Sequence, residues 1–291
     1  MASFPFSAGD AVAAAVLPPG ACDCHLHVYD SRHPAVTDAA LLPPDASIAQ
    51  YRQVQRRMGT SRAVIVTPST YGTDNGAMLA GLAELGPMGR GVAVIAADTD
   101  HASLQRMHLA GVRGVRINLS LSRTLEPDAI RPIAQRIAPL GWHLQLLMPT
   151  TLLVELAPVL RTLPVDLVFD HFGRIAPANF AAEPAHALLL ELLAGGRAWV
   201  KLSGGCIVSP LGTVEDPTLD ALARSFIDAA PDRVLWGSDW PHATSSAGKQ
   251  SFPDDARQVD RLAAWAGDAR TLQNILVANP ERLYGFAPPA P

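Results

Sequence analysis

Cysteine is scarce in this chain, and the copies present form no disulfide pattern. The 291 residues contain Cys22, Cys24 and Cys206, an odd number without a CxxC pair. Small secreted domains that depend on disulfides carry many paired cysteines, so the sequence argues against that class and favours a reducing compartment. Cys22 and Cys24 lie two residues apart on one face of a predicted strand, and we expect them to fill a core.

Charged residues are few, and lysine is almost absent. Asp, Glu, Lys and Arg make up 17% of the chain, the formal net charge is −4, and only Lys201 and Lys249 of the 23 basic residues are lysines. A chain without a basic field has nothing to attract a phosphate backbone, so nucleic acid is not an expected partner. Arginine in a pocket would instead suit bidentate binding of carboxylates.

Long apolar runs are also missing. No uncharged stretch reaches the roughly 18 residues of a membrane-spanning helix, so we expect no membrane partner. The apolar run 11–17 follows Asp10 and has no basic residue before it, unlike a secretory signal. We interpret residues 1–20 as an N-terminal arm on a cytoplasmic protein.

Short apolar segments alternate with longer segments of helical spacing. Eight short segments are continuously apolar, which is typical of parallel strands buried on both faces: 21–27, 62–67, 91–96, 114–119, 142–147, 166–171, 198–203 and 233–239. Helical spacing is found at 46–58, 74–86, 102–110, 127–138, 150–161, 184–194, 217–229, 253–265 and 268–277. This order predicts a single (β/α)8 TIM barrel over residues 21–285, with residues 286–291 as a C-terminal tail. A doubly wound open sheet is the alternative, but no GxGxxG follows the first strand.

Polar side chains gather where three of these strands end. His25 and His27 end the first strand, His171 ends the sixth, and Asp239 ends the eighth. Active sites of (β/α)8 barrels lie at the carboxyl ends of the strands, so we expect these four side chains to converge. Their combination of imidazoles and a carboxylate predicts a catalytic site.

The stretches CDCHLH, VFDHFGR and WGSDWPH resemble the amidohydrolase superfamily. The resemblance covers nearly the whole chain and is greatest to the branch that contains 2-pyrone-4,6-dicarboxylate lactonase and D-galactarolactone isomerase. It implies that Asp239 is a general base toward water, and that His25, His27 and His171 polarise a lactone carbonyl. It also implies that Arg116 and Arg174 hold substrate carboxylates.

Other candidates for substrate contact lie in the loops expected at the barrel mouth. Polar or ring-stacking contacts are expected from Ser69, Thr70, Tyr71, Asn75, Trp240 and His242. Lys201, on the seventh strand, is either a catalytic amine with a lowered pKa or the partner of a neighbouring carboxylate.

The residue types of the predicted site are compatible both with a bound metal ion and with none. Three histidines and one aspartate could bind one zinc ion, and the ligands would be His25, His27, His171 and Asp239. Metal-dependent hydrolases of the superfamily commonly add a histidine at the end of strand five, where this chain has Gln145-Leu146-Leu147 and carries His143 only at the strand's start. The branch resembled here works without metal, so we expect no required cofactor, with one zinc as the alternative.

The expected reaction is the opening of a carboxylated lactone by water that Asp239 activates. The alternatives are isomerisation of a sugar-acid lactone at the same site, zinc-dependent decarboxylation of an aromatic acid, and non-catalytic binding of a small acid. The pyrone dicarboxylate lactonase has a tyrosine late in strand five and an arginine after strand seven. At the corresponding places this chain has Leu146-Leu147 and the segment 204–208, which contain neither residue type.

The leucine-rich segment 188–193 either forms a homo-oligomer interface or faces the barrel.

Overall fold

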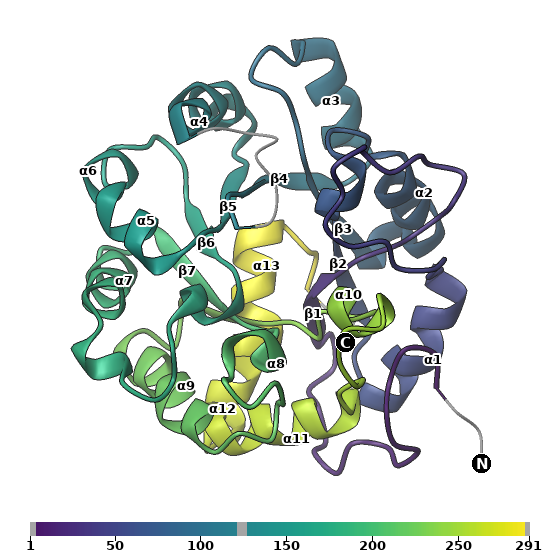
Figure 1. Ribbon diagram of the computed structural model, residues 1–291, viewed down its shortest axis with the longest axis vertical. Coiled ribbons are helices and arrows are strands. Elements are labelled where there is room, and N and C mark those ends of the chain that lie inside the picture. Colours follow the sequence, from purple (N-terminus) through teal and green to yellow (C-terminus); the bar gives the residue numbers. More distant parts are fainter. Residues whose placement is uncertain (1–3, 121–126, 289–291) are drawn as a thin grey trace.

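Eight parallel strands form the centre of the molecule, in the order β1 to β8, with helices around them (Figure 1). The computed structural model describes residues 4–120 and 127–288. The strands are β1 (Cys22–Leu26), β2 (Arg62–Val66), β3 (Gly89–Ala93), β4 (Val112–Asn118), β5 (His143–Leu147), β6 (Leu167–Phe169), β7 (Ala198–Leu202) and β8 (Val234–Trp236). The predicted (β/α)8 barrel is confirmed.

Helices connect the strands and cover the outside of the barrel (Figure 1). They are α1 (Ile48–Met58), α2 (Gly76–Leu85), α3 (His101–Leu109), α4 (Ile130–Ile137), α5 (Thr150–Glu155), α6 (Ala157–Leu160), α7 (Pro184–Ala194), α8 (Gly205–Val208), α9 (Thr218–Ala229), α10 (Ala243–Ser246), α11 (Asp255–Ala266), α12 (Ala269–Gln273) and α13 (Asn279–Tyr284). The short helices α8 and α10 lie in the loops after β7 and β8 and were not predicted. Within residues 4–120 and 127–288, no helix has the length and apolar character needed to cross a membrane.

Two apolar layers hold this architecture together. Ala63 and Ile65 of β2 pack outward in the cluster that contains Ile48 of α1, whereas Val64 and Val66 belong to a second cluster. The alternation follows from the two-residue period of a strand. Full burial of a Val or Ile side chain contributes about 1.5–3 kcal/mol, so both layers stabilise the barrel.

Two helix predictions were wrong in their boundaries because of proline. The predicted helix 150–161 is divided into α5 and α6, and Pro158 lies in the first turn of α6. The helix predicted to end before Asn279-Pro280 continues through Pro280 to Tyr284. Proline lacks an N–H, and the π-helical turn Asn274–Ala278 directly before α13 accommodates the missing hydrogen bond.

The barrel closes where the predicted site lies. The backbone N–H of Asp239 donates to the carbonyl of His25 at 2.8 Å, and that of His27 donates to Trp240 at 2.7 Å. The pairing of β1 with β2 shifts register between Asp23 and Leu26. Because of this irregularity, Cys24 and His25 both face the barrel interior although they are consecutive residues.

Both ends of the chain pack against the barrel unit. In the N-terminal arm, Ala8 donates to Pro253 at 2.9 Å, and Arg57 of α1 donates to Ala8 and Ala11. At the other end Phe286 is buried, with the Arg90 guanidinium 4.5 Å from its ring centre. The packed unit therefore extends one residue into the tail predicted at 286–291, of which residues 289–291 lie outside the described part.

Candidate functional site

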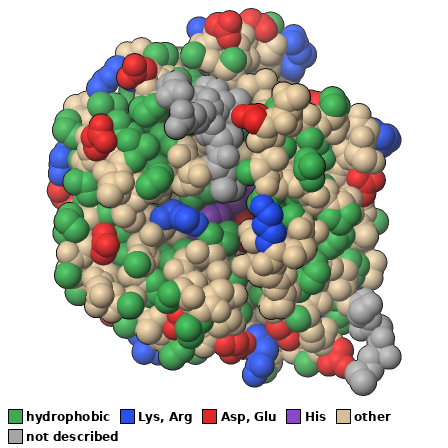
Figure 2. All heavy atoms as spheres, in the orientation of Figure 1, with side chains coloured by type: hydrophobic (Ala, Val, Ile, Leu, Met, Phe, Trp, Pro, Cys, Tyr) green, Lys and Arg blue, Asp and Glu red, His purple; other side chains and the backbone are tan. Residues whose placement is uncertain are grey.

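A cavity of about 280 Å³ opens at the carboxyl ends of the strands. Its floor is formed by His27, His171 and Asp239, and its wall includes Ser69 and Thr70. The space-filling view shows a hollow with histidine atoms inside and basic side chains on both sides (Figure 2). A hollow with apolar walls and a few polar groups is the usual form of a small-molecule site.

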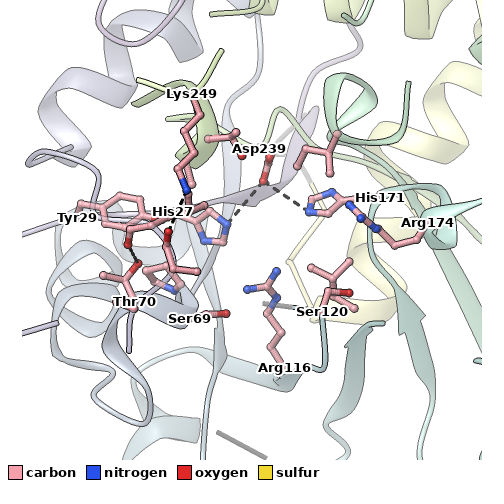
Figure 3. Close-up of a pocket in the computed structure, with 18 residues that line it drawn as sticks. His27, Tyr29, Ser69, Thr70, Arg116, Ser120, His171, Arg174, Asp239 and Lys249 are labelled. Carbon is pink, nitrogen blue, oxygen red and sulfur yellow. Dashed lines mark hydrogen bonds and ion pairs between the residues drawn. The ribbon is translucent and has the colours of Figure 1, made fainter. Parts of the chain in front are cut away.

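Asp239 is the centre of the histidine cluster (Figure 3). Its Oδ1 lies 3.6 Å from Nε2 of His25, 3.6 Å from Nε2 of His27 and 3.9 Å from Nε2 of His171. Burial alone would raise the pKa of Asp239, but the neighbouring His171, His25 and His27 outweigh it and hold the pKa below its usual value. Asp239 is therefore ionised at neutral pH, as a general base must be.

The far nitrogen of each imidazole is held by a different group. Nδ1 of His27 lies 2.7 Å from the carbonyl of Val66, which can only accept, so that nitrogen carries a proton. Nδ1 of His171 lies 2.9 Å from the hydroxyl of Ser203. Burial lowers the pKa of His27 to about 4, so its ring is neutral near pH 7 and presents a bare Nε2 to the cavity.

A tight left-handed turn after β6 places His171 and Arg174 together at the cavity. His171, Phe172, Gly173 and Arg174 have φ angles of 50°, 55°, 62° and 61°. A left-handed residue other than glycine costs about 1–2 kcal/mol, and such strain is concentrated at functional sites. A Cβ on Gly173 would come within 2.2 Å of Leu189 Cδ1, so a larger residue here would force the Leu189 side chain to move.

Beneath the cavity, side chains of β4, β5 and β7 and of the residue after β6 form a buried polar layer. Asp170 Oδ2 accepts from Arg116 Nε at 3.2 Å and from Gln145 Nε2 at 3.0 Å. Lys201 Nζ donates to Gln145 Oε1 at 2.7 Å and lies 3.6 Å from Asp170 Oδ1. Lys201 thus has the carboxylate partner that was one of its two predicted roles. Because Asp170 holds Arg116 through Nε, the rest of the guanidinium faces the cavity (Figure 3).

Four of the predicted substrate contacts lie outside the cavity lining. Tyr71 donates through its hydroxyl to Asp30, and Asn75 bridges Thr67 and Val94. Trp240 is buried, and its Nε1 donates to the carbonyl of Pro5.

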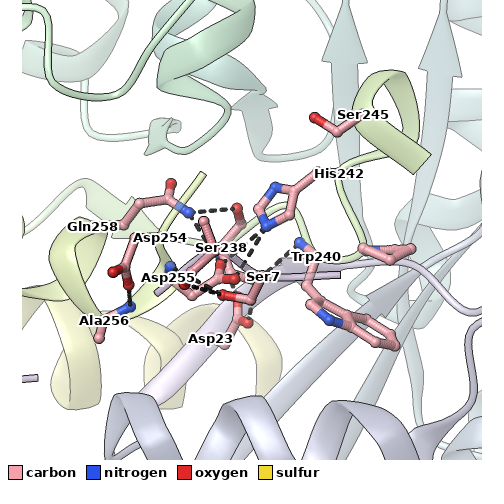
Figure 4. A network of polar contacts seen from close by, with 12 residues as sticks. Ser7, Asp23, Ser238, Trp240, His242, Ser245, Asp254, Asp255, Ala256 and Gln258 are labelled. Carbon is pink, nitrogen blue, oxygen red and sulfur yellow. Dashed lines mark hydrogen bonds and ion pairs between the residues drawn. The ribbon is translucent and has the colours of Figure 1, made fainter. Parts of the chain in front are cut away.

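The fourth of these contacts, His242, lies 3.1 Å from Asp255 in a buried network (Figure 4). Asp255 also accepts from Gln258, while Asp23 accepts from both the hydroxyl and the backbone N–H of Ser238. Burial alone would lower the pKa of His242, but Asp255 outweighs it and raises the pKa. The network holds the segment after β8 and so positions Asp239.

The cavity also has residues that sequence reasoning missed. Tyr29, Leu41, Leu147 and Ile207 supply its apolar wall, and Lys249 its rim. Leu147 is the last residue of β5 and Ile207 lies in the short helix α8, whereas Tyr29, Leu41 and Lys249 lie in loops, where no periodic pattern marks them. The only feature of the sequence that distinguishes Lys249 is the rarity of lysine in this chain.

Arg174, Arg116 and Lys249 outnumber the one carboxylate of the described lining, so its charged groups have a net positive charge. Asp239 is the one carboxylate among the described lining residues. Arg174 is half-buried, and the described part of the chain offers its guanidinium no hydrogen bond or ion pair. Lys249 donates to the carbonyl of Ala40 at 3.3 Å. A cavity with this charge balance suits an anionic ligand.

The cluster includes donor atoms that a divalent metal accepts. His25, His27 and Asp239 offer ligand atoms within 4.8 Å of one another, and His25, Asp170 and His171 do the same. Zinc bound at Nε2 of His25 would require the proton at Nδ1, the nitrogen that lies 3.4 Å from the Lys201 ammonium. The donor types fit zinc, but the buried lysine opposes it.

A barrel with His25 on β1, His27 directly after it, His171 after β6 and Asp239 after β8 has the architecture of a hydrolytic enzyme. Residues 22–286 match the amidohydrolase family, and the chain belongs to that family.

Three relatives place the chain within the family. It is 36% identical over 281 residues to a 2-pyrone-4,6-dicarboxylate hydrolase of Comamonas testosteroni, covering 92% of this chain and 91% of the relative. It is 30% identical over 275 residues to a D-galactarolactone isomerase of Agrobacterium fabrum, covering 93% of each. A crystal structure of a probable 2-pyrone-4,6-dicarboxylic acid hydrolase from Acinetobacter baumannii with bound citric acid has a TM-score of 0.80 and 27% identity, over 92% of this chain and 100% of that one.

Proposed function

We propose that this protein hydrolyses a carboxylated lactone, with Asp239 as the general base. The observation that carries the proposal is an ionised, buried Asp239 among three imidazoles, at the floor of a cavity lined by cations. The similarity to a lactone hydrolase over 92% of the chain supports it.

The attacking water lies between Asp239 and His27. A neutral His27 has its proton on Nδ1, so its bare Nε2 accepts one proton of the water as a hydrogen bond while Asp239 takes the other. The water oxygen then forms a bond to the lactone carbonyl carbon. This role as an acceptor differs from the oxyanion contact that the family resemblance implies for His27.

The carbonyl oxygen is polarised by His25 and His171. Ser203 can donate to Nδ1 of His171, which leaves the proton on Nε2 and directs it into the cavity. The negative charge that develops on the carbonyl oxygen is stabilised by such N–H donors. As the tetrahedral intermediate collapses, the ring C–O bond breaks and protonated Asp239 returns its proton to the leaving oxygen. The new carboxylic acid ionises and releases one proton to solvent.

Arg116 and Arg174 hold the anionic substituents of the substrate. Arg116 is pre-oriented by Asp170, and Arg174 has no competing carboxylate among the described residues. Planar guanidinium groups bind carboxylates with two parallel hydrogen bonds. Ser69 and Thr70 add polar contacts on the β2 side of the cavity.

The reaction needs no metal in this proposal, because Lys201 and Arg116 already supply buried positive charge beside the cluster. We also place the protein in the cytoplasm, since Cys22, Cys24 and Cys206 are free and buried, which suits a reducing compartment.

A panel of carboxylated and sugar-acid lactones, followed by proton release with and without a chelator, tests the proposal. We expect turnover of a carboxylated lactone that survives chelation. Turnover that disappears with the chelator and returns with zinc would contradict the metal-free mechanism. No ring opening of any lactone would contradict hydrolysis itself.

Isomerisation of a sugar-acid lactone is the second candidate, favoured by the 30% identity to a D-galactarolactone isomerase. A substrate hydroxyl would replace water as the nucleophile at the same site. Isomerisation releases no proton, so nuclear magnetic resonance of the products combined with the proton-release assay distinguishes the two reactions.

A further inference from the structure

Lys201 is the most deeply buried cation in the part of the chain that the structure describes, and the proposed chemistry uses its positive charge but none of its hydrogen bonds. Its side chain is fully buried, on β7, in the layer directly below the histidine cluster. An ammonium group can only donate hydrogen bonds. Its nearest acceptors are Gln145 Oε1 at 2.7 Å and His25 Nδ1 at 3.4 Å.

The orientation of Gln145 keeps Lys201 in this place. The amide oxygen of Gln145 accepts from Lys201, and the amide nitrogen donates to Asp170 at 3.0 Å. Reversal of the amide would direct its NH₂ group at the ammonium and its oxygen at the carboxylate, so the bridge has one favourable arrangement. The Lys201 ammonium is therefore held in a fixed position beside His25.

Nδ1 of His25 has two polar neighbours, one a hydrogen-bond acceptor and the other a donor. Asp170 Oδ1, 3.2 Å away, would accept a proton from Nδ1, whereas Lys201 would donate one to it. Asp170 Oδ1 has no partner with hydrogen-bond geometry within the described structure, and Asp170 acts on the His25 ring chiefly through its charge. Lys201 is therefore the group that satisfies Nδ1.

We propose that Lys201 is a positioning residue that holds His25 in the tautomer with its proton on Nε2. Nε2 of His25 is fully buried, has no hydrogen-bond partner among the described groups, and faces Asp239 Oδ1 at 3.6 Å. A proton on this nitrogen points an unused donor at the reacting centre. A bare nitrogen there would instead direct its lone pair at a carboxylate.

The consequence is that His25 on β1 and His27 directly after β1 have opposite tautomers. His27 donates through Nδ1 to Val66 and accepts at Nε2, whereas His25 accepts at Nδ1 and donates at Nε2. One ring then suits the attacking water and the other suits the carbonyl oxygen. The same arrangement disfavours a metal ion, because ligation needs a bare Nε2 on His25. This inference deepens the proposed lactone chemistry and rests on it for its kinetic consequence only.

Nitrogen-15 resonance spectroscopy of the imidazole rings tests the proposal on the full, unaltered chain. Protonated and bare imidazole nitrogens resonate in separate ranges, and His25→Gln identifies the His25 signals by their loss. We expect His25 to carry its proton on Nε2 and His27 to carry its proton on Nδ1, so that His27 is the internal reference. A proton on Nδ1 of wild-type His25 overturns the proposal, and this measurement depends neither on a Lys201 variant nor on any substrate.

Lys201→Met gives the second measurement. Without the ammonium we expect the His25 proton to move to Nδ1, kcat to fall about 10- to 100-fold with KM little changed, and zinc affinity to rise by at least about tenfold, the range typical for groups that orient a ligand. Lys249→Met removes the other lysine and leaves the His25 signals unchanged. An unchanged His25 tautomer in a folded Lys201→Met protein overturns the proposal, as does tight binding of one zinc ion by the wild type through His25. If no lactone is turned over, the proposed function fails while the spectra still decide the role of Lys201.

Discussion

Asp239→Asn removes the proposed base with little change of shape. Asparagine has nearly the same volume and tolerates the left-handed backbone that Asp239 adopts at φ 66°. The backbone hydrogen bond from residue 239 to the carbonyl of His25, 2.8 Å long, does not depend on the side chain. We therefore expect a folded protein that lacks only the carboxylate.

The size of the effect follows from the surroundings of Asp239. A general base contributes about 10²–10⁴-fold, or about 2.7–5.4 kcal/mol at 1.36 kcal/mol per factor of ten. No other carboxylate lies among the described lining residues, and burial lowers the pKa of His27 to about 4, so the ring is too weak a base to substitute. We expect kcat/KM to fall by about 10⁴-fold, the upper end of the range. KM should stay equal or decrease, because the variant removes the one negative charge facing an anionic substrate.

Proton release from a carboxylated lactone at several substrate concentrations gives both constants, and a thermal melt is the control for folding. We expect Tm to change by no more than about 5 °C, which corresponds to about 3 kcal/mol for 291 residues at about 2.1 cal/mol/K per residue. A folded variant with kcat/KM within about tenfold of the wild type would refute the assignment, because that loss is below the smallest expected for a base.

Two further predictions concern the cavity rim and the foot of the barrel. Arg174→Met should raise KM about 10- to 100-fold with kcat little changed, because hydrogen bonds to charged groups contribute about 1.5–3 kcal/mol; an unchanged KM in initial-rate measurements would show that Arg174 does not hold the substrate. His143→Gln concerns stability, since burial lowers the pKa of His143 from 6.5 to about 3. Unfolded His143 binds a proton below about pH 6.5 but the folded residue only below about 3, so wild-type stability falls as pH drops through this window by up to ~1.4 kcal/mol per pH unit. The variant should lose less stability between about pH 6 and 4 in urea denaturation, and an equal slope in both proteins would contradict the reasoning.

The roles of the two aspartates, Asp239 and Asp170, differ in how far the sequence predicts them. Asp239 follows the last strand, β8, within a recognisable motif, and its place among the histidines follows from the rule that barrel sites lie at strand ends. Asp170 stands next to His171 in the chain, yet its task of orienting Arg116 depends on the approach of β4 and β6 across β5. No spacing along the chain encodes that distance.

The predicted loop contacts show a similar division. Ser69 and Thr70 reach the cavity, whereas Tyr71, one residue further, turns away and binds Asp30. A strand end has a regular two-residue period that predicts direction, but a loop has none. Trp240 was expected at the mouth, and it is buried because the N-terminal arm covers it through Pro5.

The sequence by itself determined the class of fold and the chemical identity of the site. Eight apolar segments separated by helical segments can bury both faces of each strand in few ways. A closed barrel does so, because one face of each strand packs in the interior and the other packs against the helices. Only the tertiary structure decided how the site is charged and protonated. The register shift in β1 turns both Cys24 and His25 inward, which a regular strand forbids. Lys201 comes within 3.4 Å of His25 from the opposite side of the barrel, 176 residues away along the chain. Tautomers and pKa values depend on distances of this kind, and such distances exist only after the chain has closed on itself.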